Sequence, residues 1–145
     1  MNDDTVKESN KTFYYMGHSL GGALSTVAAL IFGAMFPDAR HVCITFGSPR
    51  VGDAKFVQLF HHHVDESVRS VNQEDPVPMV PSACRFEHVG GVQFIDKNHT
   101  IQDSITENRL LNSCKDSMLC CCGLAESPID DHDTEQYEEA WKNHK

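Results

Sequence analysis

Residues 17–21 read GHSLG, and this pentapeptide joins two segments with different structural preferences. The preceding TFYYM, residues 12–16, is aromatic-rich and ends at a glycine, which is typical of a strand. Residues 19–36 carry apolar side chains at helical spacing and stop before Pro37, so they predict a helix packed on a sheet. A chain that passes from strand to helix this quickly must turn sharply at Ser19.

The alternation of strand and helix continues after this turn. Four further segments carry the signals of a buried strand, a helix, a strand and a hairpin, in this order: residues 41–46, 54–63, 67–71 and 84–95, where CRFEHV and VQFI flank Gly90 and Gly91. Such an order implies a mostly parallel sheet with right-handed crossovers, followed by a C-terminal antiparallel hairpin. The sequence therefore indicates the α/β fold class.

The remainder of the chain gives weaker signals. Residues 97–128 are irregular, with a short helix expected near 104–119, and residues 131–143 predict a polar terminal helix with acidic residues at its start. We expect the 145 residues to form one partial domain, with a motif-bearing core at 12–96 and a C-terminal histidine segment at 97–145.

The charge balance excludes some classes of partner. The net charge is −9, with 21 acidic against 12 basic residues, which argues against nucleic acid and gives no attraction to anionic membranes. The polar, acidic start is not a signal peptide, and the longest apolar stretch, Ala23 to Phe36, is too short to span a bilayer. As written, the chain is expected to be soluble and cytoplasmic.

The cysteines and clustered histidines do not predict a metal site. Cys43 lies in an apolar run and is expected to be a buried small hydrophobe. Cys120 to Cys122 are contiguous, so they predict a reduced surface segment, with S-acylation as the alternative, rather than a metal site or a disulfide framework. His61 to His63 are consecutive on a helix and their side chains diverge. No metal or cofactor is therefore expected.

A serine in G-x-S-x-G between a strand and a helix can be a nucleophile on a strained turn. Such a turn projects the hydroxyl over the edge of the sheet, while Gly17 and Gly21 leave room for close backbone approach. The first amides of the helix can then donate to a developing oxyanion. The competing interpretation is an ordinary serine at a helix start, but the strand before it and the helix after it favour the nucleophile.

A serine nucleophile needs a base, and the base needs a carboxylate to orient it. In α/β-hydrolases the chain order is serine, acid, histidine. Asp75 follows the third strand in the proline-laden loop NQEDPVPMVPS and suits the acid, with Glu74 as its local competitor. Asp65 and Asp53 are expected to be a solvated turn and a helix cap.

Two histidines remain as candidates for the base. The others outside the cluster at 61–63 are set aside because they point elsewhere on the turn, begin a strand, lie in the hairpin or stand near the end: His18, His41, His88 and His144. His99 and His132 each lie in or after a loop beyond the last strand. Position favours His132, which opens a helix, but leaves His99 open.

Four motifs occur in one order between Phe13 and Val92: GHSLGGALS, TFGSPRVGDAKF, VNQEDPVPMVP and FEHVGG. Together with a weaker match at DHDTEQY, they resemble the class 3 (fungal-type) lipases of the α/β-hydrolase superfamily. The resemblance implies that Ser19 is the nucleophile, Asp75 the triad acid and His132 the base of a His-then-Tyr signature. It also implies that the GSPRVGD loop is structural and braces the top of the sheet.

The implied activity is that of a serine ester hydrolase acting on acylglycerols or related lipid esters through an acyl-enzyme. The Leu20 N–H is the expected first oxyanion donor, and a lipid ester is the expected partner, with peripheral contact to a lipid surface. Family members carry an N-terminal half with further strands, a lid and the second oxyanion donor, whereas eleven residues precede the first strand here. The alternative is therefore a weak or inactive lipase-like fragment that acts as a binding or regulatory module.

Overall fold

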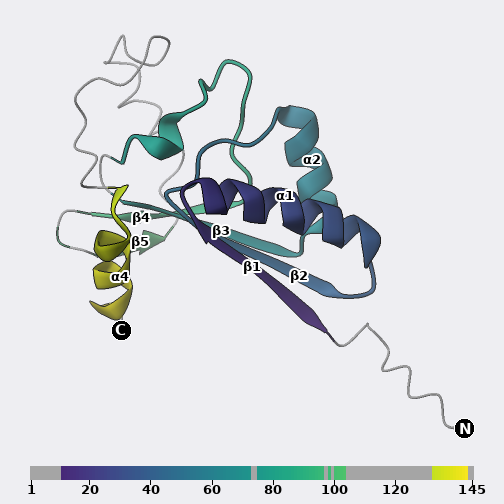
Figure 1. Cartoon of the computed structure of the whole chain (residues 1–145), viewed down its shortest axis with the longest axis horizontal. Coiled ribbons are helices and arrows are strands. Elements are labelled where there is room, and N and C mark those ends of the chain that lie inside the picture. The colour runs from purple at the N-terminus through teal and green to yellow at the C-terminus, as the bar shows by residue number, and fades with distance from the viewer. Residues whose placement is uncertain (1–10, 73–74, 97, 99, 104–131, 144–145) are drawn as a thin grey trace, which may run out of the picture.

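A single five-stranded sheet organises the described part of the chain (Figure 1). The computed structural model describes residues 11–72, 75–96, 98, 100–103 and 132–143. The elements follow one another as β1 (Thr12–His18), α1 (Leu20–Met35), β2 (Arg40–Phe46), α2 (Ala54–His63), β3 (Glu66–Asn72), the 3₁₀ helix η2 (Val77–Met79), β4 (Gly91–Ile95), β5 (Ile101–Asp103) and α4 (Thr134–Asn143). The predicted α/β class is confirmed.

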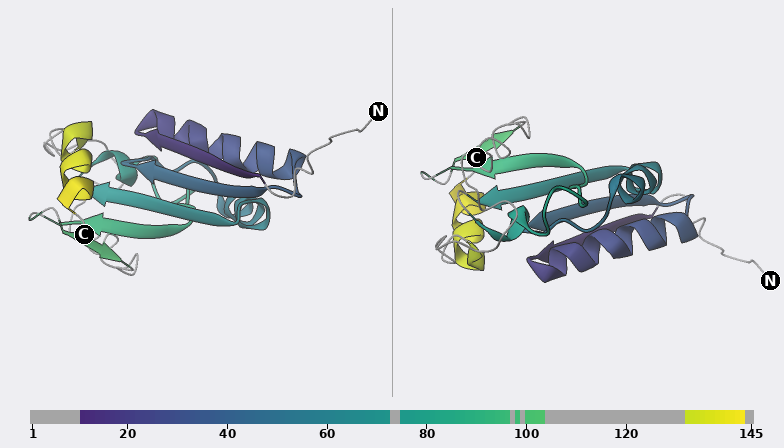
Figure 2. Two further views of the ribbon diagram at one scale, coloured as in Figure 1. Left: turned by 90° about the horizontal axis from the view of Figure 1, so that it is seen from below. Right: turned by 90° about the horizontal axis from the view of Figure 1, so that it is seen from above.

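The strands lie in sequence order across the sheet. β1 to β4 are parallel, and β5 pairs antiparallel with β4. Figure 2 shows the arrowheads of the parallel strands pointing to one edge, where α4 crosses them. Residues that follow β1, β2 and β3 therefore meet at this edge, as parallel sheets require.

The hairpin predicted within residues 84–95 is wrong in its first arm. β4 pairs in parallel with β3, and its antiparallel partner is β5. Residues 84–89 form no strand and contribute one isolated bridge, between Glu87 and Gly52. Parallel pairing forces the chain to return to the start of β3 before β4 can begin. Gly90, with φ of 71°, turns the chain into β4 where a Cβ would overlap the Ser67 side chain.

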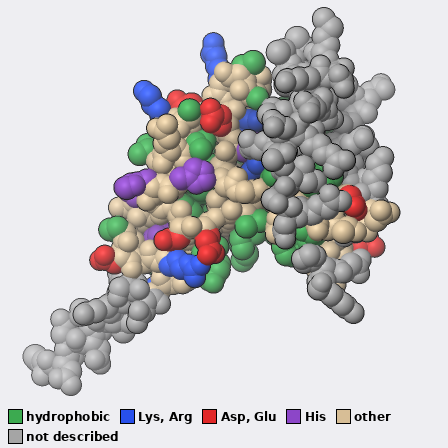
Figure 3. All heavy atoms as spheres, turned by 180° about the vertical axis from the view of Figure 1, so that it is seen from behind, with side chains coloured by type: hydrophobic (Ala, Val, Ile, Leu, Met, Phe, Trp, Pro, Cys, Tyr) green, Lys and Arg blue, Asp and Glu red, His purple; other side chains and the backbone are tan. Residues whose placement is uncertain are grey.

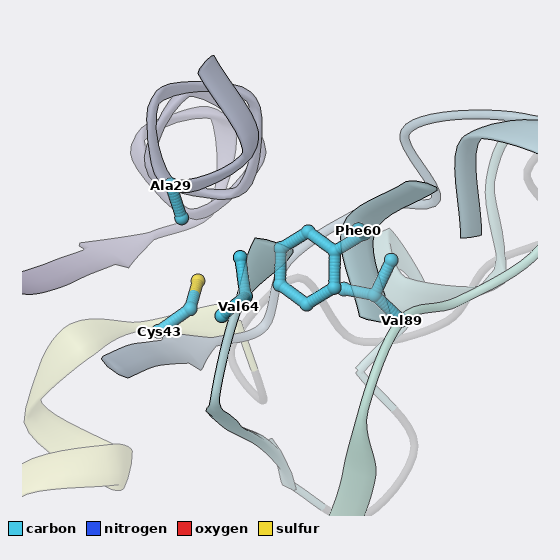
Figure 4. Packing of buried hydrophobic residues seen from close by; sticks show 5 residues of the cluster. All are labelled: Ala29, Cys43, Phe60, Val64 and Val89. Carbon is cyan, nitrogen blue, oxygen red and sulfur yellow. The ribbon is translucent and has the colours of Figure 1, made fainter. Parts of the chain in front are cut away.

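Helices α1 and α2 cover one face of the sheet (Figure 1). Figure 4 shows the buried side chains between these helices and the sheet, which come from α1, β2, α2 and two loops: Ala29, Cys43, Phe60, Val64 and Val89. Cys43 is 1% exposed, as expected of a small hydrophobe, and burial raises the pKa of its thiol to about 11. This thiol is therefore an inert part of the core.

Helix α4 packs on the opposite face, at the carboxyl edge. Tyr137 and Ala140 of α4 are buried against Ile95 of β4 and Ile101 of β5. The Phe46 ring meets the Tyr137 ring edge-on, with 6.1 Å between centroids. The predicted terminal helix is confirmed, with its first turn at Thr134, and its docking brings the preceding residues over the sheet edge.

Exposed apolar side chains occur on both β1 and α1. β1 forms an outer edge of the described sheet, and Tyr14 and Met16 on it are more than half exposed. Large exposed side chains also run along α1, namely Leu20, Leu24, Ile31, Phe32 and Met35. Within the described ranges, no helix has the length and apolar character needed to cross a membrane.

Some sequence predictions concern residues whose placement the structure does not describe. They are the competing acid, the competing base, the short helix and the cysteine cluster: Glu74, His99, residues 104–119 and Cys120 to Cys122.

Candidate active site

Ser19 occupies a strained turn between β1 and α1. Its φ of 55° and ψ of −128° make it the non-glycine residue with positive φ in the described part of the chain. The Ser19 N–H donates to the Phe46 carbonyl at 2.9 Å, and its own carbonyl accepts from the Gly22 N–H at 3.0 Å. The hydroxyl makes no helix-capping hydrogen bond. These features differ from those of an ordinary N-cap serine, which has extended dihedrals and caps its helix.

The close approach of strand and helix depends on two glycines, of which the sequence predicted one. A Cβ on Gly17 would overlap the backbone of Gly21, and a Cβ on Gly22 would lie 2.7 Å from the Ser48 Cβ. A Cβ on Gly21 would meet nothing within 4 Å among the described atoms. The role predicted for Gly21 is therefore wrong, because a helix turns by about 100° per residue and it is Gly22 that faces the sheet.

His132 joins the serine to the acid. Its Nε2 lies 2.7 Å from the Ser19 Oγ, and its Nδ1 lies 2.9 and 3.0 Å from the two carboxylate oxygens of Asp75. An ionised carboxylate only accepts hydrogen bonds, so Nδ1 carries the proton and Nε2 presents its lone pair. The serine hydroxyl therefore donates to Nε2, which is the arrangement a general base requires.

Asp75 is 1% exposed, and its carboxylate is surrounded by donors. Oδ1 accepts from the Val77 N–H at 2.9 Å, and Oδ2 accepts from the Tyr137 hydroxyl at 2.6 Å. The same hydroxyl accepts from the Asn72 N–H at 3.0 Å. Burial of a carboxylate is tolerated where hydrogen bonds replace water. From the sequence, no role was predicted for Tyr137 beyond its place in the C-terminal motif.

The proline-laden loop after Asp75 is held in place by hydrogen bonds from two segments, the GSPRVGD loop and the connection between η2 and β4. The Arg50 guanidinium donates to the Met79 carbonyl, and to the Pro81 carbonyl at 2.8 Å. The His88 Nε2 donates to the Pro78 carbonyl at 2.7 Å. Burial lowers the pKa of His88 to about 3, so this ring stays neutral. The bracing function expected of the GSPRVGD loop is thus seen in Arg50.

Gly47, the first residue after β2, leaves the space in which the site assembles. Its φ is 54°, and a Cβ there would lie 2.6 Å from the Asp75 Oδ2, 3.0 Å from the Tyr137 hydroxyl and 3.1 Å from the His132 Nδ1. No role for this glycine was predicted from the sequence. A glycine directly after a central strand, at the carboxyl edge, was the available signal.

His18 lies in the site, contrary to the prediction that it points elsewhere on the turn. Its Nε2 is 2.8 Å from the His132 backbone carbonyl, and the two ring centroids are 4.5 Å apart. His18 pairs in register with Phe46, so both side chains stand on the face that α4 covers. The Tyr137 ring accordingly meets His18 edge-on at 5.6 Å.

Leu20 begins α1, so its N–H is one of the first-turn amides without an intrahelical acceptor. The first turn of α1 contains no acidic residue, which leaves the positive end of the helix dipole uncompensated by a side chain. The Leu20 side chain is 67% exposed. The backbone N–H is thus suited to stabilise negative charge beside Ser19.

The remaining acidic candidates lie away from this cluster. Asp53 caps α2, accepting from the Phe56 N–H at 2.9 Å, as predicted. Asp65 does more than the solvated turn expected of it, because its carboxylate accepts from the His41 N–H at 2.7 Å. Among the residues with described positions, no three His, Cys, Asp or Glu side chains gather in a way that could hold a metal ion.

Comparison with known protein families gives a match over much of the chain. The family model described as "Lipase (class 3)" matches residues 3–84, a stretch that contains Ser19 and Asp75. Secreted mono- and diacylglycerol lipase 1 of Fusarium solani is 40% identical over 107 residues, which cover 68% of this chain and 31% of that protein. Phospholipase A(1) DAD1, chloroplastic, of Arabidopsis thaliana is 41% identical over 66 residues, which cover 45% of this chain and 15% of that protein.

A solved structure has a similar backbone. The triacylglyceride lipase of Rhizomucor miehei matches with a TM-score of 0.61 at 26% identity, over 82% of this chain and 45% of that chain. The chain thus spans less than half the length of each of these three proteins.

Proposed function

Because this chain belongs to the class 3 lipase family, we propose that it is a serine ester hydrolase acting on acylglycerols or related lipid esters. The observation that carries the proposal is the continuous hydrogen-bonded path from the Ser19 hydroxyl through His132 to the buried Asp75 carboxylate. A nucleophile, a base and an orienting acid within hydrogen-bond distance are the parts that acyl transfer by serine requires.

In the proposed first half-reaction, the Ser19 Oγ attacks the carbonyl carbon of the ester while the His132 Nε2 takes the hydroxyl proton. The Oγ–C bond forms, and the carbonyl oxygen becomes an oxyanion near the Leu20 N–H. Asp75 keeps the imidazolium oriented and balances its charge. When the tetrahedral intermediate collapses, the bond to the alcohol oxygen breaks and His132 returns the proton to the leaving alcohol.

In the second half-reaction, water replaces the alcohol. His132 takes a proton from the water molecule while the water oxygen attacks the carbonyl carbon of acyl-Ser19. The bond between the Ser19 Oγ and this carbon then breaks. The serine recovers the proton, and a fatty acid leaves. The positive end of α1 acts on both oxyanions, since the same carbonyl oxygen carries the charge each time.

We further propose that the exposed side of α1 contacts the lipid surface that presents the substrate. Leu20 to Met35 contain no charged residue, and the exposed side chains of this helix begin next to Ser19. Figure 3 draws the side of the molecule turned away from α1, where acidic and basic side chains lie among apolar ones. With a net charge of −9, contact with lipid would therefore rest on apolar burial rather than on attraction to anionic headgroups.

The proposal is tested with an alkyl phosphonate ester, which forms a covalent adduct with an activated serine. We expect the adduct on the tryptic peptide that contains Ser19, and we expect Ser19→Ala to abolish it. Ser25→Ala, a change in the helix that follows Ser19, is the matched control and should label normally. An adduct on another residue, or undiminished labelling of Ser19→Ala, would contradict the assignment.

The second candidate is a lipase-like module that binds lipid esters without turning them over. It is favoured by one observation: among the described residues, a single oxyanion donor has been assigned, the Leu20 N–H. This module would bind ester-containing vesicles but neither label with the phosphonate nor release fatty acid. Titration of released fatty acid from an emulsified acylglycerol separates the two candidates.

A further inference from the structure

His18 makes a contact with the base that the reaction steps above do not use. Its Nε2 lies 2.8 Å from the backbone carbonyl oxygen of His132. The two imidazoles are 4.5 Å apart between centroids and tilted by 32°. His18 is half-buried at the end of β1, directly before Ser19. The strand that delivers the nucleophile therefore also contacts the main chain that delivers the base.

The chemistry of the contact fixes the protonation of His18. A backbone carbonyl can only accept, so the His18 Nε2 must carry hydrogen. Burial lowers the pKa of His18, with the neighbouring His132 imidazole as the next cause, while the hydrogen bond to the His132 carbonyl and the carboxylates of Asp75 and Asp133 oppose this. At neutral pH the ring is thus an uncharged Nε2–H donor. It adds no second positive charge beside the imidazolium that forms during the reaction.

The position of His132 in the chain shows why a hydrogen bond to its main chain would help to place the imidazole. His132 precedes α4, whose residues buried against the sheet are Tyr137 and Ala140. A base must keep its lone pair within about 0.5 Å of the productive position. The hydrogen bond to Asp75 orients the imidazole about its side-chain bonds but leaves the main chain beneath it to other contacts.

We propose that His18 is a positioning residue, whose Nε2–H bond to the His132 carbonyl fixes the main chain so that the imidazole faces the Ser19 Oγ. This inference rests on the proposed function, because it assigns His18 to the same reaction. His18 does not touch the reacting atoms and acts through the base.

Three replacements of His18 test separately its hydrogen-bond donor, its flat ring and the length of its side chain. His18→Gln keeps an N–H donor at about the distance of Nε2, His18→Asn shortens that reach by one methylene, and His18→Phe keeps a flat ring without the donor. His62→Phe, on the exposed side of α2, is the matched control. Each variant of the full chain is assayed for kcat and KM on p-nitrophenyl butyrate. Each is also examined by NMR for the downfield proton between His132 Nδ1 and Asp75.

We expect His18→Phe and His18→Asn to lower kcat about tenfold with KM unchanged, the size of one lost hydrogen bond. We expect His18→Gln to stay within about twofold of the parent. The downfield proton should persist in the parent and in His18→Gln and exchange rapidly in the other two. A merely structural role would instead lower the melting temperature while leaving kcat per folded molecule unchanged.

The two proposals can fail separately. If the parent chain hydrolyses the ester but His18→Phe and His18→Asn keep both kcat and the protected proton, the positioning role is refuted and the hydrolase stands. If the parent shows no turnover while the NMR signal depends on the His18 donor, the hydrolase proposal fails. The positioning of His132 by the His18 hydrogen bond would still stand. Loss of the signal in His18→Gln as well would also refute the donor argument. A His18→Phe variant that does not fold leaves the Asn and Gln pair to decide.

Discussion

Gly47→Ala should disable the site more than it destabilises the fold. The residue has φ of 54°, where an alanine costs about 1–2 kcal/mol through its Cβ. That Cβ would lie 2.6 Å from the Asp75 Oδ2, whereas ordinary contact starts at 3.4 Å, so the carboxylate oxygen must retreat by about 0.8 Å. Oδ2 now accepts hydrogen bonds of 2.6 Å from Tyr137 and 2.9 Å from His132.

A retreat of this size along either bond lengthens it beyond the usual range for hydrogen bonds. Misplacement of a catalytic group by about 1 Å can cost roughly 10²-fold in rate. We therefore expect kcat on p-nitrophenyl butyrate to fall about 10²-fold, while the free energy of unfolding in urea falls by only about 1–2 kcal/mol.

Two alanine variants serve as controls. Gly90→Ala has the same kind of strain, at φ of 71° with a clash on Ser67, but Gly90 precedes β4 at the amino edge of the sheet, opposite the edge that holds the triad. It should lose comparable stability and keep its kcat. Gly21→Ala, with open space around its Cβ, should lose neither through a clash. If Gly47→Ala and Gly90→Ala lose stability equally and both keep kcat, the steric reasoning about Asp75 is refuted.

Three further outcomes are expected. His132→Ala should lower kcat by several orders of magnitude, because triad members act as a unit, while His99→Ala should change kcat little. Steady-state kinetics measure both, and the reverse result would transfer the role of base to His99. Tyr137→Phe removes the donor to Asp75 and leaves the buried Asn72 N–H without this acceptor, so the free energy of unfolding in urea should fall by about 1–3 kcal/mol; an unchanged urea midpoint would contradict this. His88 has a folded pKa of about 3 against an unfolded value of 6.5, so the unfolded chain binds the extra proton and stability declines as pH falls through this window. Between pH 7 and pH 5 the loss due to His88 is about 2 kcal/mol, so His88→Gln should show a correspondingly smaller pH dependence in urea titrations.

The elements that the sequence predicts well are those determined by local patterns. The aromatic run before Gly17, the apolar spacing up to Met35 and the β-rich segment around Cys43 each carry their own periodicity, and all three elements form where expected. The Gly90-Gly91 pair is an equally local signal, but it does not reveal which strand will be the partner. The turn there feeds a parallel strand rather than a hairpin.

The parts of the site that were missed depend on pairing between distant segments. His18 faces the base because β1 and β2 pair in a register that puts it beside Phe46, and Tyr137 reaches Asp75 because α4 docks on that same face. Neither register nor docking can be read from the neighbours of these residues in the chain. Ser19, by contrast, carries its strained turn in its own flanking residues.

The docking of α4 has a consequence for how the chemistry is lost under stress. His132 belongs to a helical segment that is anchored through Tyr137 and Ala140 on Ile95 and Ile101, whereas Ser19 and Asp75 belong to the sheet edge itself. Segments with few buried apolar contacts open at lower free energy than central strands do. Local opening of this one helix would carry the base away while β1 to β3 remain paired. Catalysis would therefore disappear, reversibly, at urea concentrations and temperatures below those at which the sheet unfolds.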